Sequence, residues 1–299
     1  MRIDPNFVQN LISAVNQVQA NEQTYTNEIS TGVSVNSLSD NPAAASQDYL
    51  LRSEISANDS FIQSASTLGS QMQVTDTALG SVVTQLTSAI SLATQGNNGT
   101  LNASNVAAVT NQLAGIRDEV VSLANSSYQG QYLFAGSQTQ TQPFALSPGS
   151  PPVVLYSGDS TVMYTVTPNG QNIQMNLPGN QVFGSGSTGV LATMNTLIND
   201  FSTGASASTI AVDISHLSAG LQTVSQQRVI LDNGLSRLQA SSTYAQSETT
   251  QLQAAQNAVI QSNPAKLAAE LSQTTTQNTS LIDMIANLDA LPTLFSRLN

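Results

Sequence analysis

Apolar residues recur at alternating steps of three and four positions along most of the chain. This is the spacing of one face of a helix, and over long segments it is that of a coiled-coil seam. The segments with this pattern are residues 11–29, 42–95, 106–123, 191–259 and 264–298. Since some are far longer than a typical globular helix, the pattern predicts a mainly α protein. We expect an elongated antiparallel helical bundle or coiled-coil rod, with its N- and C-terminal helices paired.

Capping residues mark the ends of these helices. Gly32 is a natural left-handed cap for the first helix. Asn41–Pro42 and Asn263–Pro264 each combine a side-chain cap with a first-turn proline. The turn at residues 96–100 separates the second and third helices, and Pro292 is expected to kink or shorten the last one.

The period changes to two in the middle of the chain, so a small β-rich insert is expected over residues 136–190. A turn at residues 168–170 predicts a β-hairpin. Its expected faces are Val162, Tyr164 and Val166 on one strand and Ile173, Met175 and Leu177 on the facing strand. The chain then divides into three parts: a terminal coiled-coil assembly domain (1–40 and 263–299), a helical rod domain (41–135 and 191–262) and the insert domain (136–190).

Charge narrows the classes of partner. Of 299 residues, seven are Lys or Arg and 18 are Asp or Glu, which gives a net charge of -11. Without a basic stripe, neither nucleic acid nor an anionic membrane surface is an expected partner. No apolar window is long enough to span a membrane, and the N-terminus lacks the pattern of a cleaved secretory signal. Cysteine is absent, which excludes disulfides and thiolate metal sites.

One combination of residues resembles a catalytic set. Gly158-Asp159-Ser160 and the pair Asp213 and His216 are similar to the GDS and D-x-x-H elements of one serine esterase family, in which a base and an acid activate a hydroxyl. The first element lies between two predicted strands. Only about fifty residues separate it from His216, too few for the esterase sheet. We therefore expect no catalytic residues and keep the esterase as an alternative.

Cofactor and metal sites are not expected either. Residues 184–189 fit G-x-G-x-x-G, but no alternation of strands and helices surrounds them, so a Gly/Ser linker is the better interpretation. A single histidine and scattered carboxylates offer no metal-ligand set.

The stripes of the terminal helices are the main candidate site. A helix with one apolar stripe is marginal until it packs on something, so we expect these stripes to mediate intermolecular coiled-coil assembly. The predicted interface residues are Leu11, Val15, Val18, Tyr25 and Ile29 in the N-terminal helix and Leu267, Leu271, Leu281, Ile285, Leu288 and Phe295 in the C-terminal helix.

Aromatic residues gather where the third helical segment ends. We expect Tyr132, Phe134 and Phe144 to anchor the base of the insert on the rod, because such rings bury large areas.

Several short motifs occur in an order that is typical of one family. ISTGVSVNSLSDNPAAASQ (29–47) and the helical segment 58–96 resemble the N-terminal part of flagellins and of the hook-associated protein 3 family, both members of the bacterial flagellin superfamily. YLFAGSQTQTQPF (132–144), VLYSGD (154–159) and LPGNQVF (177–183) are similar to the series Y-L-F-[AS]-G, P-F, Y-x-G-D and G-x-x-F of the hook-associated family, which flagellins lack.

The resemblance implies a structural protein at the junction of flagellar hook and filament, not an enzyme. Its implied neighbours are hook-associated protein 1, flagellin and copies of itself in a ring layer, with a flagellar export chaperone on the C-terminal helix. The implied location is the extracellular flagellum, reached through the flagellar type III system without a cleaved signal peptide. The filament subunit flagellin remains the alternative.

Overall fold

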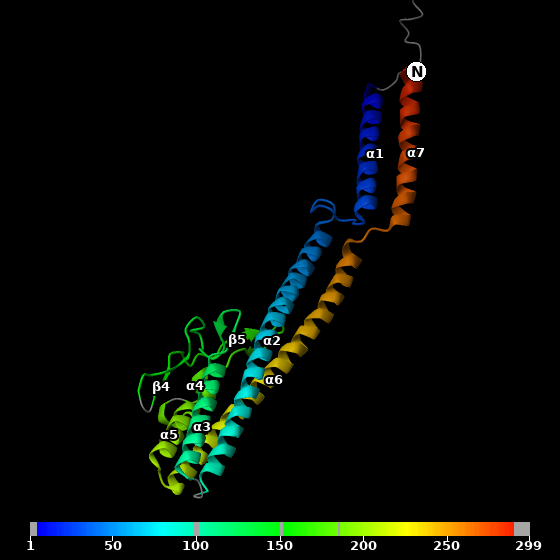
Figure 1. Ribbon diagram of the computed structural model, residues 1–299. Helices are drawn as coiled ribbons and strands as arrows, with labels where there is room; N and C mark the ends of the chain where they lie inside the picture. Colours follow the sequence, from blue (N-terminus) through cyan, green and yellow to red (C-terminus); the bar gives the residue numbers. More distant parts are fainter. Residues whose placement is uncertain (1–4, 99–101, 150–151, 185, 290–299) are drawn as a thin grey trace, which may run out of the picture. The chain divides into compact units, whose positions relative to one another are not determined.

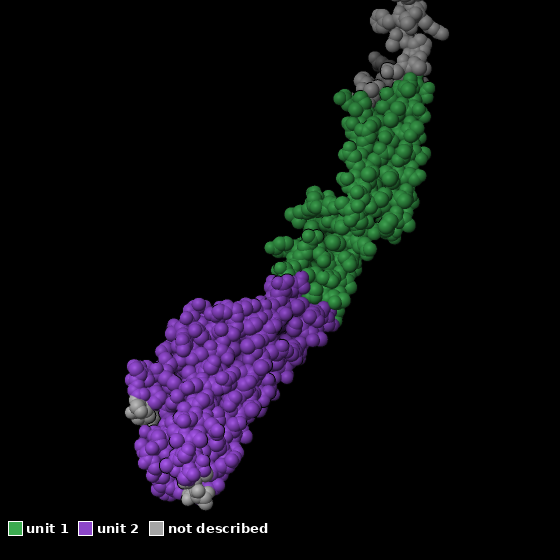
Figure 2. Space-filling model, in the orientation of Figure 1, with its two compact units in different colours: residues 1–56, 248–299 green, residues 57–247 purple. Residues whose placement is uncertain are grey.

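The computed structural model describes residues 5–98, 102–149, 152–184 and 186–289. The chain forms two compact units (Figure 2): unit 1 comprises residues 1–56 and 248–299, and unit 2 comprises residues 57–247. Two long helices, α2 (Pro42–Gly96) and α6 (Ala207–Ile260), contribute to both units. The mainly helical fold with a small β insert is confirmed, whereas the three-part division stays a prediction.

Unit 1 pairs the first and last helices, as expected. Helix α1 (Pro5–Thr31) lies beside α7 (Pro264–Asp289) (Figure 1). The predicted caps are present: Gly32 follows α1 with a φ of 72°, and Asn41 Oδ1 accepts a hydrogen bond from the Ala44 amide at 3.1 Å. Asn263 Oδ1 likewise accepts from the Lys266 amide at 3.2 Å. Pro292 lies outside the described residues.

The two connections of unit 1 are bonded to each other. Val33, between α1 and α2, forms an antiparallel bridge with Gln261, between α6 and α7. The Ser34 amide donates to the Ile260 carbonyl at 2.7 Å, and the Ser262 amide donates to the Gly32 carbonyl at 3.1 Å. These bonds therefore fix the position of the α1–α2 connection relative to the α6–α7 connection.

Unit 2 contains the main hydrophobic core, built on the coiled-coil period of the two long helices. One line of buried apolar α6 residues recurs every seven positions: Ile210, Leu217, Val224, Leu231, Leu238 and Ala245. The buried α2 residues alternate steps of four and three: Phe61, Ala65, Leu68, Met72, Thr75, Leu79, Val82, Leu86, Ala89 and Ala93. Arg228 of α6 bonds to Asp76 of α2 through Nη2 and Oδ2 at 3.0 Å, which fixes the antiparallel register of the pair.

Two further helices complete this core. Helix α3 (Ala103–Ala124) packs on α5 (Val190–Thr203) (Figure 1). The sequence pattern treated residues 191–259 as one helical run, and this is wrong at one point. Gly204, with a φ of 70°, ends α5 in the left-handed conformation, and α6 begins at Ala207. Between Phe201 and Ile210 the only apolar residues are two alanines, so the apolar period is interrupted at the break.

The β structure of the described chain consists of separate antiparallel pairs: β1 (Ser127–Tyr128) with β2 (Gln131–Tyr132), β3 (Phe144–Leu146) with β4 (Val154–Tyr156), and β5 (Tyr164–Val166) with β6 (Asn172–Gln174). Short helices α4 (Gly179–Val182) and η1 (Gly186–Thr188) follow β6.

The predicted hairpin is confirmed. Ile173 is buried and lies opposite Thr165, while Tyr164 and Val166 are exposed on the other face. Since side chains alternate along a strand, this register places the two apolar sets on opposite faces of the pair.

Candidate functional site

The predicted stripes of the terminal helices lie largely at the contact between these two helices of the same chain. Leu11 and Leu267 are buried, with 8% and 5% exposure. Half-buried positions are Val15, Val18, Tyr25, Leu271, Leu281 and Ile285, whereas Ile29 is 40% exposed. The Leu288 side chain and Phe295 lie outside the described residues. Pairing of α1 with α7 thus already covers most of the described stripe.

Polar residues interrupt this seam. Asn278 Nδ2 of α7 donates to Glu22 Oε2 of α1 at 3.2 Å, and Asn278 Oδ1 is buried without a hydrogen-bond partner. Burial raises the pKa of Glu28 nearby, with further contributions from the charges of Asp40 and Glu270. A polar layer in a coiled coil fixes the register of the two helices at a cost in stability. The polar residues of the α1–α7 seam therefore define the register of this pair and lower its stability.

A second set of large apolar side chains in unit 1 faces solvent. On the terminal helices these are Phe7, Ile12, Ile29, Ile282 and Met284, with exposures of 41%, 50%, 40%, 48% and 46%. Near the start of α2 they are Leu38, Tyr49 and Leu50, with exposures of 68%, 74% and 61%. Apart from Ile29, these residues were not predicted as interface residues, because they lie beside the seam positions that the period of three and four defines. An apolar residue directly beside a seam position, such as Ile12 next to Leu11, could have indicated them in the sequence.

Aromatic rings form a closed cluster in unit 2. The Phe183 ring meets Phe134 edge to face at a centroid distance of 5.4 Å and Phe144 at 5.3 Å. The Phe144 ring also packs on Tyr156 at 5.0 Å. Phe134, Phe144 and Phe183 are all but fully buried. Two of the three predicted anchor residues therefore meet here, whereas Tyr132 is half-buried and has no ring contact among the described residues.

A carboxylate locks two of the sequence motifs together. Asp159 accepts hydrogen bonds from the Ser137 amide at 2.9 Å, from the Ser137 hydroxyl and from the Thr161 amide at 2.9 Å. These bonds, that of the Ser137 hydroxyl foremost, lower the pKa of Asp159 to about 2. A Cβ atom on Gly136 would lie 2.1 Å from Asp159 Oδ1. The glycine that ends the motif YLFAG is therefore needed to make room for the aspartate that ends the motif YSGD.

The other motifs join at the same place. The Tyr156 hydroxyl lies 3.1 Å from the Phe134 carbonyl and 2.8 Å from the Asp159 carbonyl. The Gly179 amide donates to the Phe134 carbonyl at 2.7 Å, and a Cβ on Gly179 would lie 2.7 Å from Phe144 Cε2. We call this set the motif lock: the aromatic cluster together with Gly136, Asp159 and Gly179. It explains why the four motifs occur together.

The motif lock leaves little for the esterase alternative. Asp159 of the GDS element accepts hydrogen bonds from Ser137 and Thr161, so its carboxylate orients a loop. Asp213 and His216 lie on α6, and the pKa of Asp213 responds to Asp200 more than to His216. No group of three or more His, Asp or Glu suited to a metal occurs among the described residues.

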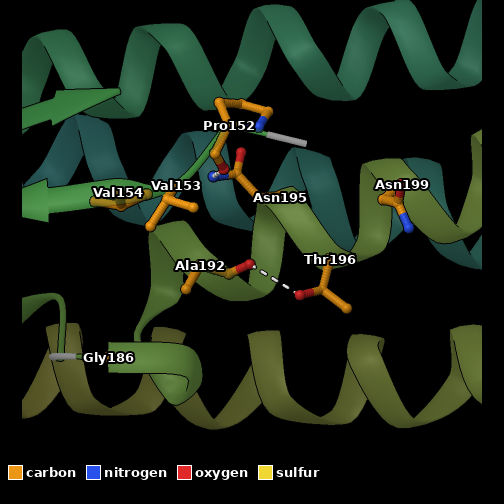
Figure 3. Close-up of a pocket in the computed structure, with 8 residues that line it drawn as sticks. All are labelled: Pro152, Val153, Val154, Gly186, Ala192, Asn195, Thr196 and Asn199. Atoms are coloured by element: carbon orange, nitrogen blue, oxygen red, sulfur yellow. Dashed lines mark hydrogen bonds between the residues drawn. The ribbon is translucent and has the colours of Figure 1, made fainter. Parts of the chain in front are cut away.

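A cavity of about 400 Å³ lies between the segment before β4 and helix α5 (Figure 3). The Asn195 amide nitrogen donates to the Pro152 carbonyl at 2.8 Å, and its oxygen accepts from Arg117 Nη1 at 3.2 Å. The Thr196 hydroxyl donates to the Ala192 carbonyl at 3.2 Å, shown as the dashed line. These polar groups already have partners, and the residues drawn include no acid, base or nucleophile beyond a threonine hydroxyl. The cavity therefore offers no catalytic set.

No helix in the described ranges contains a stretch that is both long and apolar enough to cross a bilayer.

Comparison with known proteins gives a consistent result. Residues 6–139 match the family model of the bacterial flagellin N-terminal helical region. Flagellar hook-associated protein 3 of Salmonella typhimurium is 29% identical over 188 residues, which cover 62% of this chain and 57% of that protein. The Escherichia coli protein of the same name is 31% identical over 144 residues, which cover 48% and 45%. The chain thus spans about half the length of the curated relatives it matches, and it is similar to flagellar hook-associated protein 3.

Solved structures share the fold. A flagellar hook-associated protein from Vibrio parahaemolyticus aligns with a TM-score of 0.67 at 21% identity, covering 74% of this chain and 99% of that one. Bacillus cereus FlgL aligns with a TM-score of 0.56 at 18% identity, covering 70% and 99%. The flagellar junction protein FlgL from Legionella pneumophila aligns with a TM-score of 0.55 at 13% identity, covering 64% and 99%.

Proposed function

We propose that this chain is a structural protein of the bacterial flagellum that joins the hook to the filament by helix packing. The observation that carries the proposal is the likeness to two proteins named flagellar hook-associated protein 3, together with an assembled motif lock at the residues that suggested this family. A structural role fits a described chain in which Asp159 of the GDS element is hydrogen-bonded within a loop.

In this proposal, the contacts with neighbouring subunits are made by unit 1. The seam of unit 1 is covered by the contact between α1 and α7 of the same chain. The solvent-facing apolar side chains are therefore the ones that can contact a neighbouring subunit. We define the outer flank as the exposed large apolar residues of α1 and α7, which lie on more than one side of the two helices: Phe7, Ile12, Ile29, Ile282 and Met284. Full burial of an exposed side chain of this size is worth roughly 1.5–3 kcal/mol. Because these residues are already about half buried, a neighbouring subunit can supply about half of that for each. The predicted interface is thereby refined from the seam to the outer flank.

The proposed neighbours follow from the resemblance. Hook-associated protein 1 lies on the hook side, flagellin on the filament side, and copies of this chain complete a layer. An export chaperone holds the C-terminal helix before assembly, and delivery is through the flagellar type III channel. The marginal, polar-interrupted α1–α7 seam supports this route, because a pair with little stability of its own can remain unfolded in transit and become ordered on a template.

Charged substitutions in the outer flank test the proposal. A strain lacking its own gene is complemented with the double variant Ile12→Asp and Ile282→Asp, and filaments are counted by electron microscopy. We expect hooks without filaments and flagellin released into the medium, because a charge cannot be buried at the contact. The matched control is Gln23→Asp with Gln273→Asp, at exposed polar positions of the same helices.

Export must be measured in the same cultures. The variant protein should reach the medium in the same amount as the control, which separates failed assembly from failed secretion. Normal filaments with the double variant would contradict the outer flank as the contact surface. Normal filaments in the uncomplemented strain would contradict the junction function itself.

Flagellin, the filament subunit, is a second candidate because residues 6–139 match a flagellin family model. The purified full chain distinguishes the two. A filament subunit polymerises alone into long filaments, whereas a junction protein is expected to stop at small assemblies.

A further inference from the structure

The hairpin formed by β5 and β6 packs against α6 along one of its two edges. Arg237 Nη2 of α6 donates to the Asn172 carbonyl of β6 at 3.2 Å. A Cβ atom on Gly234 of α6 would lie 3.2 Å from the Gln174 carbonyl oxygen, so the helix backbone approaches this strand closely. The edge of β6 that does not pair with β5 therefore lies against α6. The free edge of β5 is the outer edge of the hairpin.

The backbone of β5 leaves donors and acceptors unused on this outer edge. The Thr167 amide donates to the Gln171 carbonyl at 2.9 Å, and the antiparallel register continues from there along the two strands. Because hydrogen-bonded and non-hydrogen-bonded pairs alternate in such a ladder, the N–H and C=O groups of Tyr164 and Val166 point away from β6. Within the ranges that the structure describes, these groups have no hydrogen-bond partner.

Other strands of the insert have their edges closed. At β3, the Phe144 amide donates to Asn125 Oδ1 at 2.9 Å, and Asn125 Nδ2 donates to the Phe144 carbonyl at 2.8 Å. Natural proteins commonly protect a free edge with such a cover, with a charged side chain or with a proline. The β5 edge has none of these, and its outward side chains Tyr164 and Val166 are 57% and 61% exposed.

The chain around this edge carries almost no charge. Between Glu119 and Asp200, Asp159 is the only charged residue of the sequence, and its carboxylate is hydrogen-bonded within a loop. Nearly all of the net charge of -11 therefore lies on other parts of the chain. Two copies repel each other where those parts meet, but not at the insert. This lack of charge favours a second copy as the occupant of the β5 edge.

We infer that two copies of the chain pair through the free edges of their β5 strands, antiparallel about a two-fold axis at Thr165. This register places Tyr164 opposite Val166 of the second copy, and the reverse. Both are hydrogen-bonded pairs, since the backbone groups of these residues are the ones that point outward. An aromatic residue opposite a β-branched residue stabilises such a pair. The two hairpins then form one continuous antiparallel sheet.

This contact goes beyond the proposed junction function. A two-fold contact closes at two copies, whereas the contacts of a layer repeat around an axis. It therefore concerns the free chain, involves unit 2 alone and does not depend on the flagellar function. Because β5 spans only Tyr164–Val166, the contact is small and the dimer is expected to be weak.

Cysteine cross-linking of the full-length chain tests the register. The chain contains no cysteine, so each variant carries a single thiol. Thr165→Cys places two thiols across the two-fold axis in a non-hydrogen-bonded pair, with Cα atoms about 4.5 Å apart, which suits a disulfide. Gln171→Cys, at an exposed position of the same hairpin, is the control. With oxidised glutathione, we expect the disulfide dimer to form at least about tenfold faster in Thr165→Cys.

Sedimentation equilibrium measures the association itself. We expect the parent chain to dimerise reversibly at high protein concentration. Val166→Lys should raise the dissociation constant at least about tenfold, because a charge on the edge opposes strand pairing. Val229→Lys makes the same change of charge at a valine of α6 that is 58% exposed, and should leave the constant unchanged. The double variant Ile12→Asp and Ile282→Asp should dimerise like the parent, because the outer flank is not part of this contact.

Equal cross-linking rates for the two cysteines, or a parent chain that stays monomeric at its highest soluble concentration, would overturn the inference. So would a dimer that is lost in the double variant and retained in Val166→Lys, because association would then use the outer flank. If Thr165→Cys does not fold, the sedimentation comparison still decides.

Discussion

Removing one ring from the motif lock should destabilise unit 2 strongly. Phe144 is 2% exposed and packs on Phe183 at 5.3 Å and on Tyr156 at 5.0 Å. Truncation to alanine in a closed core costs about 3–5 kcal/mol, from lost burial and from the cavity that remains. We take about 4 kcal/mol for Phe144→Ala, since the ring is enclosed on both faces. For a unit of this size, 57–247, that corresponds to a fall of roughly 10 °C in melting temperature.

Circular dichroism during thermal and urea unfolding of the full chain measures this effect. Tyr164→Ala is the matched control, because Tyr164 is an aromatic residue of the same insert that is 57% exposed. Its cost should stay within about 0.5 kcal/mol. A double-mutant cycle of Phe144→Leu with Phe183→Leu should give a coupling of about 0.5–1.5 kcal/mol. A loss for Phe144→Ala below about 1 kcal/mol, or one equal to the control, would refute the closed cluster.

Three further predictions use single substitutions. Gly136→Ala should cost at least about 1–2 kcal/mol of unfolding free energy from its left-handed backbone, plus the clash with Asp159, whereas Gly130→Ala, also left-handed but in open space, should show the backbone part alone. Because the pKa of Asp159 is lowered to about 2, its stabilisation is present above the ordinary value of 3.8 and is lost as the pH falls through 2, so Asp159→Asn should flatten the acid part of the melting-temperature profile. Leu231→Ala should cost about 2–5 kcal/mol and Ile230→Ala much less by urea unfolding, because these neighbours on α6 are 3% and 43% exposed; equal costs would contradict the heptad core.

The helices and their ends could be predicted because the relevant information is local. A period of three and four positions defines one face of a helix wherever the chain lies, and Asn41 and Asn263 cap helices through bonds to residues only two or three positions away. The break at Gly204 was not predicted, although its signal is local as well. Residues 202–209 read STGASAST, in which only alanines are apolar, and Gly204 ends α5 with a positive φ.

The candidate sites depended on partners that lie far apart in the chain. The four motifs could be recognised as a series, but the contact of Gly136 with Asp159 and the position of Phe183 between Phe134 and Phe144 come from the tertiary structure.

Long amphipathic helices with a β insert could be predicted from the sequence alone, since period, caps and turn residues act within a few positions. The helix that packs on each apolar stripe is known only from the tertiary structure. An apolar stripe indicates that one face of a helix is buried, but it does not indicate whether the same chain or another copy covers that face. Here α7 covers Leu11 and its stripe, whereas the large apolar residues beside the seam remain exposed to solvent. The register of the β5–β6 pair is likewise known only from the tertiary structure. Ile173 is buried opposite Thr165, so Tyr164, the neighbour of Thr165, faces solvent.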